Sequence, residues 1–110
     1  TRTTYGEMRE LPETRKMMTD LMYEIYTLAA TAGVKIEKSY VSEVIAAIDG
    51  YPYGSSTSLA RDVWEGRPSE IEYQNGTVVR LAQKYGVEVP VNRFVYSCIL
   101  PMEIKARKKM

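Results

Sequence analysis

The stretch that decides the fold is residues 55–92, which read SSTSLARDVWEGRPSEIEYQNGTVVRLAQKYGVEVPVN. It places a serine-rich turn, a short helix, a second helix and the proline that starts a third helix in close succession. Gly66 and Gly86 are expected to end the first two helices, because glycine readily adopts the left-handed conformation that closes a helix. The one β-like run, residues 87–91, is too short for a sheet, so the stretch predicts helices joined by short turns.

Hydroxyl side chains are expected to cap two of these helices. Ser58 is placed to cap a short helix over residues 59–65. Ser69 and Glu72 match the Ser-x-x-Glu capping box, in which the two side chains satisfy backbone N–H groups of the first turn. The box predicts a second helix that runs from there to Tyr85.

Asn75 and Gly76 are two unfavourable residues side by side on this second helix. Asn75 interrupts an apolar stripe, and a glycine inside a helix costs about 1 kcal/mol relative to alanine. One interpretation is a close helix crossing at Gly76 with Asn75 bonded to a neighbouring backbone group. The other is that the Asn75 amide faces a polar cleft.

Apolar periodicity predicts two helices upstream. The first begins at Pro12 and ends at Gly33, and the second begins after Ser39 and ends at Gly50. Apolar residues recur every three or four positions along the first helix, which predicts one buried stripe. This stripe consists of Met18, Leu21, Met22, Ile25, Leu28, Ala29 and Ala32.

The two ends of the chain complete the expected fold. Residues 1–11 are polar, with Gly6 as a turn or a point of close approach. A last helix begins at Pro90 and runs to Pro101, whose missing N–H is expected to kink or end it. The chain is therefore predicted to be one all-α domain over residues 1–110, a bundle of about five helices.

The composition is that of an ordinary globular protein. A chain of 110 residues is long enough for one core and too short for two. Its 45% hydrophobic and 26% charged residues exclude a disordered chain. The net charge of +1 gives no field that would attract nucleic acid or an anionic membrane, and the basic run 105–109 is interpreted as a solvated helix end.

Cysteine and histidine usage limits the chemistry. Cys98 is the only cysteine, so an intrachain disulfide is impossible and a cytoplasmic location is favoured. Its apolar neighbours indicate a buried, inert thiol. Histidine is absent, which leaves carboxylates as the ligands for any metal, and no metal site is predicted. No apolar run approaches the roughly 18 residues of a membrane span.

The ordered motifs of the central stretch resemble the C-terminal helical domain of ketopantoate reductase (2-dehydropantoate 2-reductase). The family's pattern is Ser-Ser-Met, Leu-Gln-Asp, Thr-Glu-Ile-Asp, Asn-Gly, Val-Val-Arg and Gly-Val-x-x-Pro-x-Asn, preceded by Asn-Gly-Glu-Leu. Here the matching residues are Tyr5-Gly6-Glu7-Met8, Thr57-Ser58-Leu59, Ala60-Arg61-Asp62, Ser69-Glu70-Ile71-Glu72, Asn75-Gly76, Val78-Val79-Arg80, and Gly86-Val87 through Pro90 to Asn92.

The resemblance implies a helical domain like the C-terminal domain of 6-phosphogluconate dehydrogenase. It also implies an NADPH-dependent reductase that converts 2-dehydropantoate to pantoate on the route to coenzyme A. In this family an N-terminal Rossmann domain binds NADP, and the helical domain supplies substrate contacts. A lysine on the first long helix of the second domain is the general acid.

Two residues carry family roles by position. Ser58 matches the serine that binds the substrate carboxylate, and a plain helix cap is its structural alternative. Glu70 matches the glutamate that contacts cofactor or substrate hydroxyls, and a favourable charge at a helix start is its alternative. Asp62 matches in identity and is assigned no role. Tyr5 replaces a substrate-binding asparagine, which leaves a related 2-keto acid open as the substrate.

The family's cofactor motif is not matched, since none of the seven glycines forms G-x-G-x-x-G. We therefore expect the chain to be a C-terminal fragment, inactive alone, with no catalytic residue of its own. We also expect it to self-associate through the apolar stripe of its first long helix. The alternative is a stand-alone helical interaction module that presents Tyr23, Tyr26, Tyr51 and Tyr53 to a partner. Binding of nucleic acid through the basic tail is a distant third.

Overall fold

The computed structural model describes residues 1–109, and within them the chain forms six helices and no strand. The helices are α1 (Tyr5–Glu10), α2 (Pro12–Thr31), α3 (Tyr40–Asp49), α4 (Ser58–Trp64), α5 (Asn75–Tyr85) and α6 (Pro90–Lys108). The all-α prediction is confirmed. The additional helix is α1, whose Thr4-x-x-Glu7 capping box lies in the polar segment 1–11, for which the sequence predicted only a turn or close approach at Gly6.

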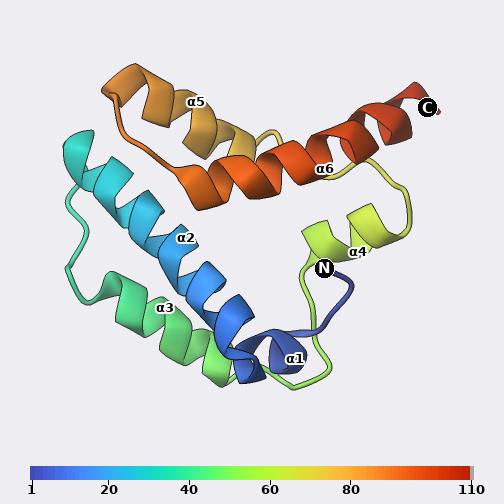
Figure 1. The fold of residues 1–110 in the computed structure, drawn as a ribbon, viewed down its shortest axis with the longest axis horizontal. Coiled ribbons are helices and arrows are strands. Elements are labelled where there is room, and N and C mark those ends of the chain that lie inside the picture. Colours follow the sequence, from blue (N-terminus) through green and yellow to red (C-terminus); the bar gives the residue numbers. More distant parts are fainter. Residues whose placement is uncertain (110) are drawn as a thin grey trace.

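The helices form two pairs with two short helices beside them (Figure 1). α3 packs along α2 and α5 along α6, and both α5 and α6 contact α2. α1 packs against α2 and α3 at one end, whereas α4 packs against α6. The molecule is flat, with extents of 40 × 34 × 20 Å, and its N-terminus lies beside α4 (Figure 1).

The core lies where α2, α5 and the link into α6 meet. Leu28, Ala82 and Val89 form a buried cluster there, and Val78 and Val87 pack against it. Of the predicted stripe on α2 only Leu28 is fully buried, and the other six residues are half-buried. The flat shape explains this result, because α2 has neighbours on only part of its circumference.

The start of α6 is capped by a side chain from another helix. The Glu24 carboxylate of α2 accepts from the backbone N–H groups of Val91 and Asn92, at 2.8 and 2.9 Å. These N–H groups have no partner inside α6, and the positive end of the helix favours a carboxylate. Asn92 is fully buried, and its Nδ2 donates to Glu24 at 2.8 Å and to the Leu21 carbonyl at 3.2 Å.

Asn75 and Gly76 are explained by this junction. A Cβ at Gly76 would lie 3.2 Å from the Ile71 carbonyl and 3.3 Å from Tyr96 Cε1, so the predicted close crossing is confirmed. The Asn75 amide donates to Asn92 Oδ1 at 3.0 Å. Its partner is therefore a side chain, whereas the close-crossing interpretation expected a backbone group. Its role is to join the start of α5 to the start of α6.

α6 continues through Pro101 to Lys108. The helix does not end at this proline, so that part of the prediction is wrong. Proline removes the hydrogen bond to the Ser97 carbonyl four residues earlier. Ser97 and Pro101 are both exposed, so water can satisfy that carbonyl. Beyond Pro101, polar contacts from Glu103 and Arg107 to Ser69 hold the last turns of the helix.

The prediction that Cys98 is buried is also wrong, because the residue is exposed. The inward stripe of α6 runs through Asn92, Tyr96, Ile99 and Glu103, at spacings of three and four residues. Cys98 lies off this stripe, on the solvent side, despite its apolar neighbours in sequence.

Two predicted caps are replaced by others. Thr57, not Ser58, caps α4, since its hydroxyl accepts from the Ala60 N–H at 3.0 Å. Ser69 and Glu72 form no capping box, because α5 begins only at Asn75 and residues 70–74 form turns. Each member of the predicted box has a tertiary partner on α6 instead, described below.

Candidate functional site

Ser58 is the first residue of α4, and it is exposed. Since Thr57 makes the capping hydrogen bond, the structural alternative for Ser58, a plain cap, does not hold. The Ser58 hydroxyl therefore lies on the surface at the positive end of a short helix. A hydroxyl in this position can donate to an anionic ligand.

The serine-rich turn before Ser58 is held by the N-terminal segment. The Tyr5 N–H donates to the Ser55 carbonyl at 2.9 Å, and the Gly6 N–H donates to the Tyr53 carbonyl at 3.0 Å. These bonds place the backbone of Tyr5 against Ser55, which is three positions before Ser58 in the chain. The segment is also tied to the end of α4, where Trp64 Nε1 donates to the Thr1 carbonyl at 3.0 Å.

Tyrosines fill the contact between α1 and this turn. The Tyr5 ring meets the Tyr51 ring edge to face, with centroids 4.9 Å apart, and burial, followed by the neighbouring Tyr51, raises the pKa of Tyr5. The Tyr53 hydroxyl donates to Glu10 at 3.0 Å, and this bond raises the pKa of Tyr53. Tyr51 and Tyr53 therefore contact α1. These two of the four tyrosines that the interaction-module alternative presents to a partner already pack, in part, within the chain.

Gly6 is the point of close approach expected from the sequence. A Cβ there would lie 2.1 Å from Tyr53 Cδ2 and 2.3 Å from Tyr53 Cγ. We expect Gly6→Ala to lower the free energy of unfolding by about 1–3 kcal/mol, because the ring must leave its place against α1. Urea denaturation measures the change. Gly54→Ala is the matched control in the same turn, since no atom lies within 4 Å of its added Cβ, and an equal loss in both variants would contradict the prediction.

Glu70 lies in the turn between α4 and α5, and its side chain is exposed. Its carbonyl accepts from the N–H groups of Tyr73 and Gln74, both at 3.0 Å, so the turn closes on this residue. Ser69 and Ile71 on either side are buried at 4% and 0% exposure. Glu70 does not begin a helix, so the structural alternative of a charge at a helix start does not hold.

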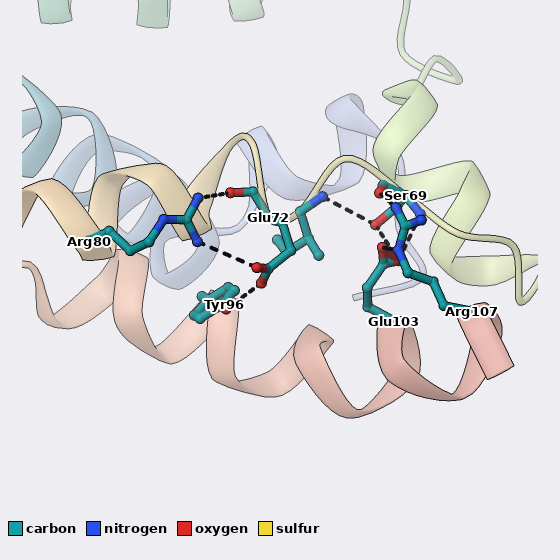
Figure 2. Close-up of polar contacts among 7 residues, drawn as sticks. Ser69, Glu72, Arg80, Tyr96, Glu103 and Arg107 are labelled. Carbon is teal, nitrogen blue, oxygen red and sulfur yellow. Dashed lines mark hydrogen bonds and ion pairs between the residues drawn. The ribbon is translucent and has the colours of Figure 1, made fainter.

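Ser69 is held by a buried carboxylate on α6 (Figure 2). Glu103 Oε1 accepts from the Ser69 N–H at 2.7 Å and from the Ser69 hydroxyl at 3.2 Å. Arg107 donates to Glu103 Oε2 at 2.8 Å and to the Ser69 carbonyl at 3.2 Å. Burial alone would raise the pKa of Glu103, but the bonds from Ser69 and Arg107 together hold it below its usual value.

The pH dependence of stability follows from this depressed pKa. A carboxylate whose pKa is lowered by folding stabilises the protein above about pH 4.5, its ordinary value, and that contribution is lost as the pH falls through the folded pKa. We expect wild type to be more stable than Glu103→Gln at pH 7 and this difference to shrink toward pH 3. Denaturant unfolding at several pH values measures it, and a constant difference would contradict the prediction.

Glu72 is held on the other side of Glu70, also by α6 (Figure 2). The Tyr96 hydroxyl donates to Glu72 Oε1, and this hydrogen bond raises the pKa of Tyr96. Arg80 of α5 donates to the Glu72 carbonyl at 2.6 Å and to its carboxylate at 3.4 Å. Tyr96, Glu103 and Arg107 were not among the predicted site residues. Glu103 and Arg107 lie beyond Pro101, where the sequence predicts a kink or the end of the helix.

A groove lies between α2 and α3 and is not lined by either predicted site residue, Ser58 or Glu70. Its volume is about 370 Å³, and its lining includes Tyr23 and the Arg15–Asp49 ion pair at 2.6 Å. Residues 1–109 contain no group of three or more side chains that could hold a metal ion. In the same residues, no helix is both long and apolar enough to cross a bilayer.

Comparison with protein families gives one match over most of the chain. The family described as "Ketopantoate reductase PanE/ApbA C terminal" matches residues 1–103. The 2-dehydropantoate 2-reductase of Pyrobaculum aerophilum is 32% identical over 98 residues, which cover 89% of this chain and 35% of that protein. That of Aquifex aeolicus is 29% identical over 109 residues, which cover 91% of this chain and 33% of that protein.

Solved structures show the same helical arrangement. A PanE/ApbA family ketopantoate reductase from Ralstonia eutropha JMP134 superposes with a TM-score of 0.83 and 30% identity, over 96% of this chain and 35% of that one. D-mandelate dehydrogenase with NADH and anilino(oxo)acetate superposes with a TM-score of 0.80 and 25% identity, over 96% and 35%. The chain thus spans about a third of the length of the relatives it matches. Because the family match covers residues 1–103, the chain belongs to the ketopantoate reductase C-terminal family.

Proposed function

We propose that this chain is the substrate-binding helical domain of an NADPH-dependent reductase that converts 2-dehydropantoate to pantoate, in pantothenate and coenzyme A biosynthesis. The observation that carries the proposal is the family match over residues 1–103, together with the exposed Ser58 at the start of α4. The names of the relatives from Pyrobaculum aerophilum and Aquifex aeolicus support the same reaction. A cytoplasmic location fits such an enzyme.

Ser58 and Glu70 are the residues of this chain that would contact the ligands. The Ser58 hydroxyl donates to the substrate carboxylate, and the free N–H groups of the first turn of α4 add a favourable potential. Glu70 accepts hydrogen bonds from cofactor hydroxyls, for which an exposed carboxylate on a fixed turn is suited. The nicotinamide cofactor would supply the hydride, and its dinucleotide site and the general acid would come from residues outside this chain.

The exact 2-keto acid depends on Tyr5. The structure of D-mandelate dehydrogenase, which shares this helical fold, holds NADH and anilino(oxo)acetate, a ligand with an aromatic ring. Tyr5 next to Tyr51 makes this part of the surface aromatic. These observations are reasons to test related 2-keto acids in addition to 2-dehydropantoate, and to test each substrate with both NADPH and NADH.

Replacing Tyr5 is expected to shift substrate preference. We expect Tyr5→Asn to raise kcat/KM for 2-dehydropantoate relative to that for an aromatic 2-keto acid by about tenfold, the effect of one hydrogen bond or one pocket contact. The ratio is measured in competition between the two substrates. Tyr40→Asn, on α3, is the control, and an unchanged ratio in Tyr5→Asn would contradict a role of Tyr5 in specificity.

The proposal is tested with two polypeptides, this chain alone and the longer polypeptide that joins it to a dinucleotide-binding domain. The longer polypeptide is expected to oxidise NADPH when 2-dehydropantoate is added, whereas the 110-residue chain alone is expected to give no turnover. Absorbance at the NADPH maximum follows both reactions. Turnover by the chain alone, or none by the longer polypeptide, would refute the proposal.

Self-association of the 110-residue chain is a further part of the proposal. The half-buried side chains of α2, such as Met18, Leu21 and Ile25, present apolar surface that a second copy would cover. Analytical ultracentrifugation is expected to show dimers or larger species that form with increasing concentration. A clean monomer at high concentration would count against it.

A further inference from the structure

We propose that Glu103 and Arg107 of α6 are positioning residues for Glu70: they fix the backbone beside Glu70 so that its carboxylate is held toward the bound cofactor. The inference rests on the proposed function, in which Glu70 contacts the cofactor. The juxtaposition that carries it is the contact of both α6 side chains with Ser69, the residue directly before Glu70.

The first observation is that every polar group of Ser69 has a partner. Its N–H and hydroxyl donate to Glu103 Oε1 at 2.7 and 3.2 Å, and its carbonyl accepts from Arg107 at 3.2 Å. Arg107 also donates to the second oxygen of Glu103, at 2.8 Å. Ser69 and Glu103 are both 4% exposed, so water does not compete for the two bonds between them, whereas the Arg107 side chain is half exposed.

The second observation is that the chain is also fixed directly after Glu70. Ile71 is fully buried, and its N–H donates to the Ser69 hydroxyl at 3.3 Å. Glu72 accepts from Tyr96 and Arg80. Glu70 is thus an exposed residue between buried Ser69 and Ile71. Its turn is joined to α6 on one side through Ser69 and on the other through Glu72 (Figure 2).

The buried carboxylate of Glu103 indicates that this contact positions the turn and does not only pack it against α6. An apolar contact between this turn and α6 would cost less desolvation than a buried carboxylate. Directed hydrogen bonds to the N–H, hydroxyl and carbonyl of one residue fix the orientation of the backbone, which an apolar contact leaves free. A turn that is already fixed loses less conformational entropy when a ligand binds Glu70, so the affinity for the ligand is higher.

The experiment compares steady-state constants of the longer polypeptide with and without these side chains. We expect Glu103→Gln to raise KM for NADPH about 5- to 10-fold, with KM for the 2-keto acid changed less than about twofold, because the turn loses its fixed position. Glu70→Ala is expected to raise the same KM at least as much. In the double variant the two effects should not multiply, since Glu103 acts through Glu70.

Glu24→Gln is the matched control. Glu24 is also a carboxylate that accepts backbone N–H groups of another segment, but it acts at the opposite end of α6. It is expected to lower stability and to leave KM for NADPH unchanged. An equal rise of this KM in Glu24→Gln would show that the Glu103 effect reports stability alone, and would overturn the inference.

If the Glu103→Gln variant fails to fold, a second variant and a second measurement still test the inference. Ser69→Ala removes only the hydroxyl, keeps the N–H bond to Glu103, and is expected to raise KM for NADPH about twofold. Amide hydrogen exchange of the 110-residue chain is expected to speed up over residues 69–74 in both variants, and not in α2. Unchanged exchange there would overturn the inference.

The outcomes separate the inference from the proposed function. If Glu70→Ala raises KM for NADPH and neither Glu103→Gln nor Ser69→Ala does, the positioning role is wrong and the role of Glu70 stands. If Glu70→Ala leaves all constants unchanged, the cofactor contact itself is wrong, and the positioning role that depends on it is overturned with it.

Discussion

Asn92→Ala is expected to lower the free energy of unfolding by about 3 kcal/mol, a large part of the roughly 5–15 kcal/mol of a typical domain. The Asn92 side chain is fully buried and bonds to three partners, Leu21, Glu24 and Asn75, on two other helices. Alanine removes these hydrogen bonds from the junction and opens a small cavity. Thermal and urea unfolding of the 110-residue chain measure the loss.

Asn75→Ala is the graded control for this prediction. It removes a single hydrogen bond of the same junction, from a half-buried residue, and is expected to cost about 1 kcal/mol. If both variants lost the same stability, the junction of α2, α5 and α6 would not depend on Asn92. The asparagine of the family pattern would then need a role outside the fold.

Ser58→Ala is expected to lower kcat/KM for the 2-keto acid about 10- to 100-fold in the longer polypeptide. A hydrogen bond to a charged group contributes about 1.5–3 kcal/mol, and each 1.4 kcal/mol is a factor of ten. The fold should be unaffected, because Thr57 makes the cap of α4. Steady-state kinetics and a urea titration on the same preparation measure both effects.

Two other hydroxyl variants show whether this effect is specific. Thr57→Ala is expected to lower stability by about 1 kcal/mol, the cost of a lost helix cap, whereas Ser58→Ala leaves stability unchanged. Ser42→Ala, an exposed serine on α3, is expected to leave both stability and kcat/KM unchanged. A stability loss in Ser58→Ala without a change in kcat/KM would mean that Ser58 serves α4 and not the substrate.

Local signals in the sequence predict much of the fold. Gly50 and Gly86 occupy the C-caps of α3 and α5, and Gly33, Gly66 and Gly86 adopt positive φ at helix ends, as expected. Pro12 and Pro90 start α2 and α6. These residues act through their own backbone geometry, so their effect is visible without knowledge of distant partners.

Contacts between distant residues decide what local signals leave open. The Thr-x-x-Glu pattern at Thr4 and the Ser-x-x-Glu pattern at Ser69 look alike, but only the first forms a capping box. Ser69 is bonded to Glu103, 34 positions away, and this contact competes with a local cap. The hydrogen bonds that fix the chain on both sides of Glu70 could not be predicted for the same reason, although the resemblance singled out Glu70 itself as a candidate site residue.

The most direct test of the account is the yield of pantoate per NADPH oxidised by the longer polypeptide, in wild type and in the Ser58→Ala, Glu70→Ala double variant. The account predicts one pantoate per NADPH for wild type. A loss of kcat/KM of at least about 100-fold is expected in the double variant, with an unchanged unfolding curve, because the proposed function has Ser58 contact the substrate and Glu70 contact the cofactor. A double variant that retains the wild-type kcat/KM would contradict it.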